Sequence, residues 1–181
     1  MNISIRERRF SFTSEFDISA PGCKYHARKS ILSLNGKLRL LTEDGRELAR
    51  IKGFFSPFRS RHEFRFPDGR IYLFRCEQLL KRVFVCEGNG ECFRLYEHRG
   101  LKYSIFQDDS QIAAFAKNRL VIGNGNQYQI RMNADASLVL VLCLVLTINA
   151  SESDNREAGV TVDLGNLGPE ARPFDQTWEP R

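Results

Sequence analysis

Leu138-Val139-Leu140-Val141-Leu142-Cys143-Leu144-Val145-Leu146 is the most uniformly apolar stretch of this 181-residue chain. An element that is apolar on every side must be buried on every side, so the stretch predicts the centre of a domain that the rest of the chain surrounds. Its alternating Leu and Val residues also fit a buried strand, and periodicity alone leaves a helix and a strand both open.

The length of this stretch argues against a transmembrane segment. Apolar residues extend over 136–148, which is about 20 Å as a helix, whereas the hydrocarbon core of a bilayer is about 30 Å thick. Asp135 precedes the stretch, and Asn149, Ser151 and Glu152 follow it. We therefore predict a buried core helix near residues 135–148. Its core residues would be Leu138, Leu140, Leu142, Leu144 and Leu146.

The chain before Asp135 reads as a series of short strands. Asp44-Gly45, Asp68-Gly69 and Asn89-Gly90 separate alternating apolar segments, and such dipeptides favour hairpin turns because these turns need positive φ angles. About twelve strands at this spacing are typical of a barrel or a sandwich. The predicted strands are 3–10, 15–19, 25–33, 37–43, 46–54, 61–67, 70–76, 81–87, 91–97, 102–107, 111–118 and 127–133.

Composition changes after Ala150. Residues 151–181 contain three glycines and three prolines with few adjacent apolar residues, a composition that buries too little surface to offset the entropy of ordering. We expect a domain over 1–150, followed by a flexible acidic tail over 151–181.

Charge is divided unevenly between these two parts. The chain carries a net charge of +5; the tail has seven acidic residues against three arginines, so residues 1–150 carry +9. A basic body favours an anionic partner such as a membrane surface, with nucleic acid a weaker alternative. A solvated strand face rich in Arg and Lys, which discourages edge-to-edge pairing, explains the same charge without a ligand.

Several cations fall at alternating positions of neighbouring predicted strands and therefore predict one basic face. Arg6 and Arg8 lie on a nearby strand, and Phe54, Phe55 and Phe58 are the aromatic residues closest to the face. The candidate anion-binding or lipid-binding residues are Arg28, Lys29, Lys37, Arg39, Arg50, Lys52, Arg59 and Arg61.

The remaining reactive residue types do not form a recognisable catalytic or metal motif. The five cysteines are odd in number and include no C-x-x-C pair, so we expect reduced thiols in a cytoplasmic protein. No apolar signal-peptide core follows Met1. His26, His62 and His98 lie far apart beside Arg or Lys, and we expect them at the surface. The sequence predicts no enzyme activity, no cofactor and no metal.

Ordered short segments resemble the LURP-one-related group of the tubby C-terminal-like fold, with phospholipid scramblases as distant kin. The resemblance covers roughly residues 1–150 and excludes the tail. The segments are Tyr25-His26-Ala27-Arg28, Leu32-Ser33-Leu34, Lys37-Leu38-Arg39-Leu40, the run from Asp44 to Lys52, Ser56-Pro57-Phe58, Tyr103-Ser104-Ile105, Ile112-Ala113 and Tyr128-Gln129-Ile130.

The resemblance implies a closed β-barrel of about twelve strands around the hydrophobic helix. It also implies a membrane-lipid connection by analogy, although fold does not fix function. We therefore expect a non-enzymatic binding module that contacts anionic phospholipid or another polyanion, in the cytoplasm or at a membrane periphery. Two alternatives stay open. One is a carrier of a small apolar ligand, or an enzyme, with its site at a barrel end; the other is a structural or adaptor protein whose acidic tail regulates it or meets a protein partner.

Overall fold

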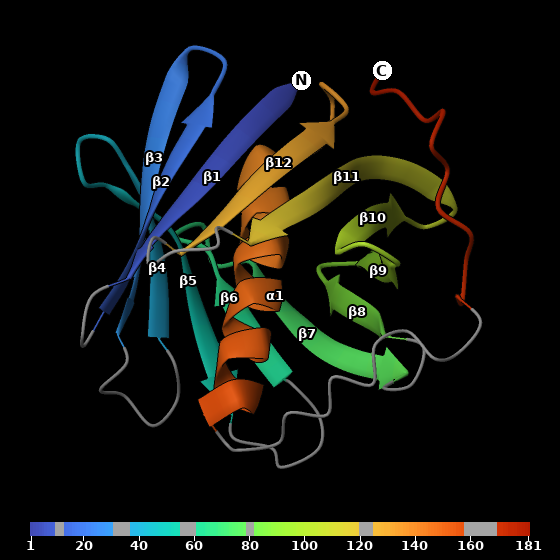
Figure 1. Cartoon of the computed structure of the whole chain (residues 1–181). Coiled ribbons are helices and arrows are strands. Elements are labelled where there is room, and N and C mark those ends of the chain that lie inside the picture. Colours follow the sequence, from blue (N-terminus) through green and yellow to red (C-terminus); the bar gives the residue numbers. More distant parts are fainter. Residues whose placement is uncertain (10–12, 31–36, 55–60, 79–81, 120–124, 158–169) are drawn as a thin grey trace.

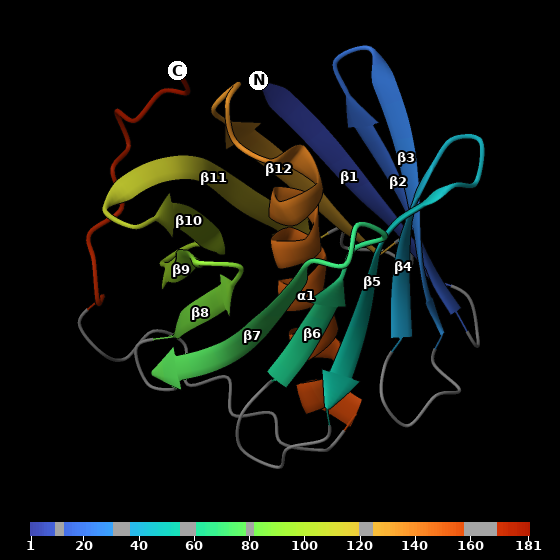
Figure 2. The same ribbon diagram turned by 180° about the vertical axis from the view of Figure 1, so that it is seen from behind.

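The computed structural model describes residues 1–9, 13–30, 37–54, 61–78, 82–119, 125–157 and 170–181. Twelve antiparallel strands form a closed barrel, in which β1 pairs with β12 and every other strand pairs with its neighbours in sequence. One helix, α1, follows β12 and lies inside the barrel (Figure 1 and Figure 2). The elements are β1 (Asn2–Arg9), β2 (Thr13–Ala20), β3 (Cys23–Ser30), β4 (Lys37–Thr42), β5 (Glu47–Phe54), β6 (Arg61–Arg65), β7 (Ile71–Gln78), β8 (Val83–Gly88), β9 (Glu91–His98), β10 (Lys102–Gln107), β11 (Ser110–Arg119), β12 (Asn126–Met132) and α1 (Leu138–Glu157).

Alternation of residue type along the strands produces this barrel. In β2, Phe16 and Ile18 are buried, whereas Glu15 and Asp17 between them are only half-buried, since successive side chains of a strand point to opposite faces of a sheet. The predicted turn at Asn89-Gly90 is confirmed by positive φ angles of 52° and 80°. The predicted closed barrel of twelve strands is confirmed as well.

Helix α1 fills a space that strand side chains alone leave open. Side chains just fill a barrel of eight strands, and the diameter grows with the number of strands, so twelve strands enclose room for a helix about 10 Å wide. Residues 140–150 are all buried, and Leu142 and Leu144 are fully buried. Leu138, predicted to be a core residue, is only partly buried at the first position of the helix.

The helix extends beyond its predicted end. Residues 151–157, which their polar composition assigned to the tail, continue α1 to Glu157. A helix that is already formed adds residues at little cost, because the unfavourable step is nucleation. Within the described part of the chain, no helix combines the length and the apolarity that a bilayer-spanning segment needs.

The first part of the C-terminal segment 170–181, from Glu170 to Phe174, lies against the outer surface of β9 and β10. The Arg172 guanidinium lies 3.8 Å from the centroid of the Phe106 ring, and the Phe174 ring lies 5.0 Å from that of His98. The segment also continues to the β12–α1 connection, where the Arg181 carbonyl accepts a hydrogen bond. These contacts differ from the expectation of a loosely packed tail, because they depend on surfaces that only the folded barrel brings together.

Acid should weaken the docking of this segment. Burial lowers the pKa of His98, although the Glu170 carboxylate 3.7 Å away acts in the opposite direction. The Arg99 N–H donates to Glu170 and lowers the pKa of its carboxyl. The docked structure therefore favours neutral His98 and ionised Glu170, so this contribution to docking is present above the ordinary pKa of His, about 6.5, and declines as the pH falls. The groups facing this site also include Lys102, whose ammonium lies over the Phe174 ring, Ser104, whose hydroxyl lies 2.7 Å from His98 Nε2, and the backbone of Arg172.

The single tryptophan, Trp178, reports on this docking because it is half-buried in the same segment. We expect its emission to shift reversibly to longer wavelength between pH 7 and pH 5, with the far-UV spectrum of the barrel unchanged. In a His98→Gln variant this shift should disappear, since the remaining Glu170 titrates at lower pH. An identical shift in both proteins would contradict the role of His98.

Candidate functional site

Four arginines form a row across the outer face of β3–β6. The strand register places Arg28 opposite Arg39, Arg39 opposite Arg50, and Arg50 opposite Arg65. Neighbouring strands are about 4.8 Å apart, so the row extends over about 14 Å. Like charges directly opposite each other destabilise a sheet, and the row is therefore difficult to explain as a stabilising feature.

Further cations surround this row. Lys37 lies opposite Lys52 on the adjacent strand, two residues along the ladder from the Arg39–Arg50 pair. Arg61 lies opposite Phe54 and Arg75 on its two neighbouring strands. We call the outer surface of β3–β6 the basic face. It carries eight cationic side chains, against two carboxylates, Glu47 and Glu63. The cations are Lys24, Arg28, Lys37, Arg39, Arg50, Lys52, Arg61 and Arg65.

The carboxylates within the basic face leave its arginines exposed. Glu47 lies between two of them, 3.8 Å from Arg39 Nε and 3.0 Å from Arg50 Nη2. The side chains of Arg39 and Arg50 are nevertheless 61% and 49% exposed. Ion pairs between side chains this exposed contribute about 0–1 kcal/mol to stability. An incoming anion could therefore replace Glu47 as the partner of these arginines at little cost in free energy.

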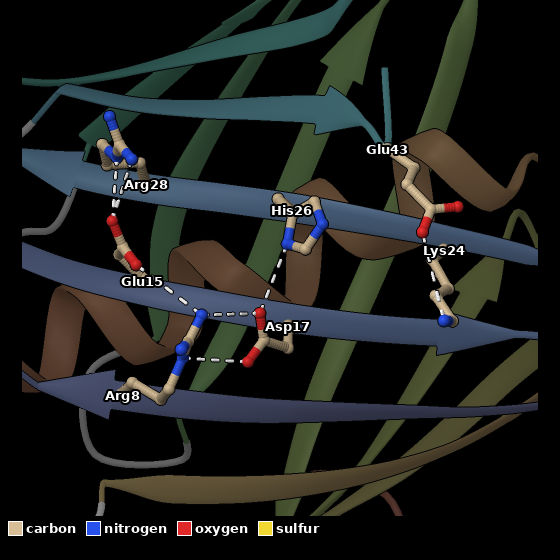
Figure 3. A network of polar contacts seen from close by, with 7 residues as sticks. All are labelled: Arg8, Glu15, Asp17, Lys24, His26, Arg28 and Glu43. Carbon is tan, nitrogen blue, oxygen red and sulfur yellow. Dashed lines mark hydrogen bonds and ion pairs between the residues drawn. The ribbon is translucent and has the colours of Figure 1, made fainter. Parts of the chain in front are cut away.

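A charge-balanced network forms the β2 border of the basic face (Figure 3). Glu15 accepts from Arg28 Nε at 3.1 Å and lies 3.7 Å from Arg8. Asp17 pairs with Arg8 at 2.9 Å and lies 3.3 Å from His26 Nδ1. Carboxylates therefore alternate with cations across β1–β3, whereas cations adjoin one another from β3 onwards, and this change marks the edge of the face.

The structure brings most of the predicted anion-binding residues together. Arg28, Lys37, Arg39, Arg50, Lys52 and Arg61 all lie at outward-facing positions of β3–β6. Lys29 does not, because it is 7% exposed and shares the inward-facing side of β3 with Ala27. Adjacent residues of one strand face opposite sides, so Arg28 and Lys29 cannot belong to the same surface. Arg59 lies outside the described residues.

Two cations of the basic face, Lys24 and Arg65, were not predicted from the sequence, and of these only Arg65 belongs to the arginine row. Arg65 alternates with the buried Phe64 and Phe66, and this alternation was the available signal for an outward-facing position. Its place at the end of the arginine row depends on the pairing of β5 with β6, which one sequence does not reveal.

Buried polar residues line the inside of the barrel at the end where β12 begins. Asn126 donates from its backbone and side-chain nitrogens to Glu7 Oε2, at 3.0 and 2.6 Å, and its side chain also donates to Asn149 of α1 at 3.1 Å. Lys117 lies with its ammonium 5.7 Å from the Tyr128 ring centroid. The buried polar groups thus interact with other residues of the chain. Such an arrangement is typical of a structural network, which here connects β1 and β12 to α1.

Two of the three histidines and three of the five cysteines are buried. The expectation of surface histidines is wrong for His62 and His98, which are 4% and 1% exposed, because both lie beside aromatic rings. Burial raises the pKa of the Cys86 and Cys143 thiols, which keeps them protonated and unreactive. No cluster of three or more potential metal ligands occurs among the residues that the structure describes.

Comparison with known families gives a match over most of the chain. A model of the LURP-one-related family matches residues 1–149, which comprise the barrel and the buried part of α1. The chain belongs to the LURP-one-related family. Membership confirms the family that the ordered segments indicated. Searches of curated proteins and of solved structures find no significant match.

Proposed function

We propose that this LURP-one-related protein is a non-catalytic module that binds anionic phospholipid or another polyanion through the basic face. The row Arg28–Arg39–Arg50–Arg65 is the observation that carries the proposal. Four like charges at strand spacing reduce the stability of the sheet, and an anionic partner would relieve that repulsion. Each cation held near an acidic membrane surface contributes about 1 kcal/mol, so four to six of them suffice for weak, reversible binding. The proposal places the protein in the cytoplasm, as a peripheral membrane component when it is bound.

Co-sedimentation with vesicles tests this class of function. The full chain is mixed with vesicles of phosphatidylcholine alone or with added phosphatidylserine, at 50 and 200 mM salt. We expect pelleting with the acidic vesicles only, decreasing with salt because screening weakens interactions between exposed charges. Equal and negligible pelleting under all four conditions, together with no binding to heparin or single-stranded DNA, would exclude the proposal.

The docked segment 170–181 bears on the alternative in which the acidic tail covers the basic body. In a closed barrel of twelve strands, β9 and β10 lie across from β3 and β4. Glu170 and the residues that follow it as far as Phe174 are thus held on the side of the barrel that faces away from the arginine row. This placement supports an adaptor role for the tail on a second surface more than autoinhibition of the basic face by these residues.

A further inference from the structure

Three large apolar side chains are exposed among the described residues, and all lie on one surface. Phe54 on β5 is 41% exposed, and Ile71 and Leu73 on β7 are 44% and 56% exposed. Single exposed apolar residues are ordinary on proteins. These three occupy the two strands that flank β6, so they form a group at the edge of the basic face.

Cations alternate with these apolar residues. The register places Arg61 between Phe54 and Arg75, and it places Arg65 between Arg50 and Ile71. The Lys52 ammonium lies 5.1 Å from the Phe54 ring centroid. Arginine and lysine stems lie along apolar surface while their charged ends reach towards polar groups, so this outer surface of β5–β7 presents apolar and cationic groups side by side.

The carboxylates nearest Leu73 are already paired. Glu63 and Glu87 lie opposite Leu73 on β6 and β8. Glu63 pairs with Arg65, and Glu87 lies 3.0 Å from Arg75. Because Arg65 and Arg75 offset the charges of these two carboxylates, Glu63 and Glu87 repel an acidic surface only weakly.

We infer that the outer surface of β5–β7 contacts an acidic lipid bilayer, with Phe54, Ile71 and Leu73 entering the interfacial layer beside the headgroups. A soluble polyanion offers charge alone, whereas a bilayer surface offers both acidic headgroups and an apolar layer that takes up aromatic and aliphatic side chains. The inference rests on the proposed function and selects the bilayer as the source of the anions.

A triple variant separates the bilayer from a soluble polyanion. Phe54→Ser/Ile71→Ser/Leu73→Ser keeps every charge, and Asn118→Ser/Gln129→Ser on the exposed outer surface of β11 and β12 is the control. We expect the triple variant to lower partition onto phosphatidylserine-containing vesicles at least about tenfold, and to leave the dissociation constant for heparin within about twofold of the unsubstituted protein. The control should change neither quantity. Thermal melts verify that both variants fold.

The possible failures are distinguishable. Vesicle partition of the folded triple variant within twofold of the unsubstituted protein would overturn the inference while the proposed function stands. Equal loss of heparin and vesicle binding would also overturn it, because the apolar groups would then serve a soluble polyanion. If Arg39→Gln/Arg50→Gln alters neither binding, the proposed function itself fails.

Direct insertion has its own readout. In a Phe54→Trp variant, vesicles with brominated acyl chains should quench the added fluorescence, while the natural Trp178, three residues before the Arg181 that bonds Asn133 and Ala134 after β12, should not be quenched. Absence of quenching of the new tryptophan in vesicle-bound protein would contradict insertion at this position.

Discussion

Replacing Leu142 by Asp should unfold the domain at neutral pH. Leu142 is fully buried in α1 inside the barrel, so the substitution removes an apolar side chain at a cost of about 2–5 kcal/mol. It also places a carboxyl group where no water solvates it, which costs several kcal/mol more. Native domains are stable by only about 5–15 kcal/mol. We expect loss of the cooperative thermal transition and aggregation in size-exclusion chromatography.

The same substitution at Leu73 is the matched control. Leu73 is 56% exposed on the outer surface of β7, so Leu73→Asp should retain a cooperative transition close to that of the unsubstituted protein. A folded Leu142→Asp protein with an unchanged transition would show that α1 is not the core of the domain.

Neutralising two arginines of the row should weaken anion binding without weakening the fold. Arg39→Gln/Arg50→Gln removes two cations from the basic face, a loss of about 2 kcal/mol near an acidic surface or about 30-fold in affinity. Because the two arginines lie directly opposite each other, their removal also relieves a repulsion. We expect a melting temperature equal to or above that of the unsubstituted protein, measured by circular dichroism.

A second variant separates the basic face from net charge. Asn118→Glu/Gln129→Glu changes the net charge by the same two units at exposed positions of β11 and β12. We expect it to weaken vesicle binding by no more than about threefold. An equal loss of binding in both variants would mean that binding follows the charge of the whole protein.

Local patterns in the sequence predict the strands and the core helix. Alternation such as that around Phe16 and Ile18 and the turn at Asn89-Gly90 act over a few residues, and the structure reproduces them. Helix α1 is predictable for a different reason, since a stretch without a polar face has one stable location in a domain.

Features that depend on contacts between distant parts of the chain were harder to predict from the sequence. The end of α1 at Glu157 was missed because residues 151–157 are polar, and the contacts of Arg172 with Phe106 require a surface assembled from separate strands. The membership of the basic face was predicted in part. Strand alternation was sufficient to exclude Lys29, whereas the alignment of Arg28 with Arg65 across four strands required the pairing register.

The most direct test of the account is a map of binding on the protein in solution. Uniformly ¹⁵N-labelled full-length protein would be titrated with nanodiscs containing phosphatidylserine, and amide signals would be compared with those in phosphatidylcholine nanodiscs. We expect the amides of β3–β7 to lose intensity or shift first, and only with the acidic lipid. Changes scattered around the barrel, or concentrated on β9 and β10, would contradict it.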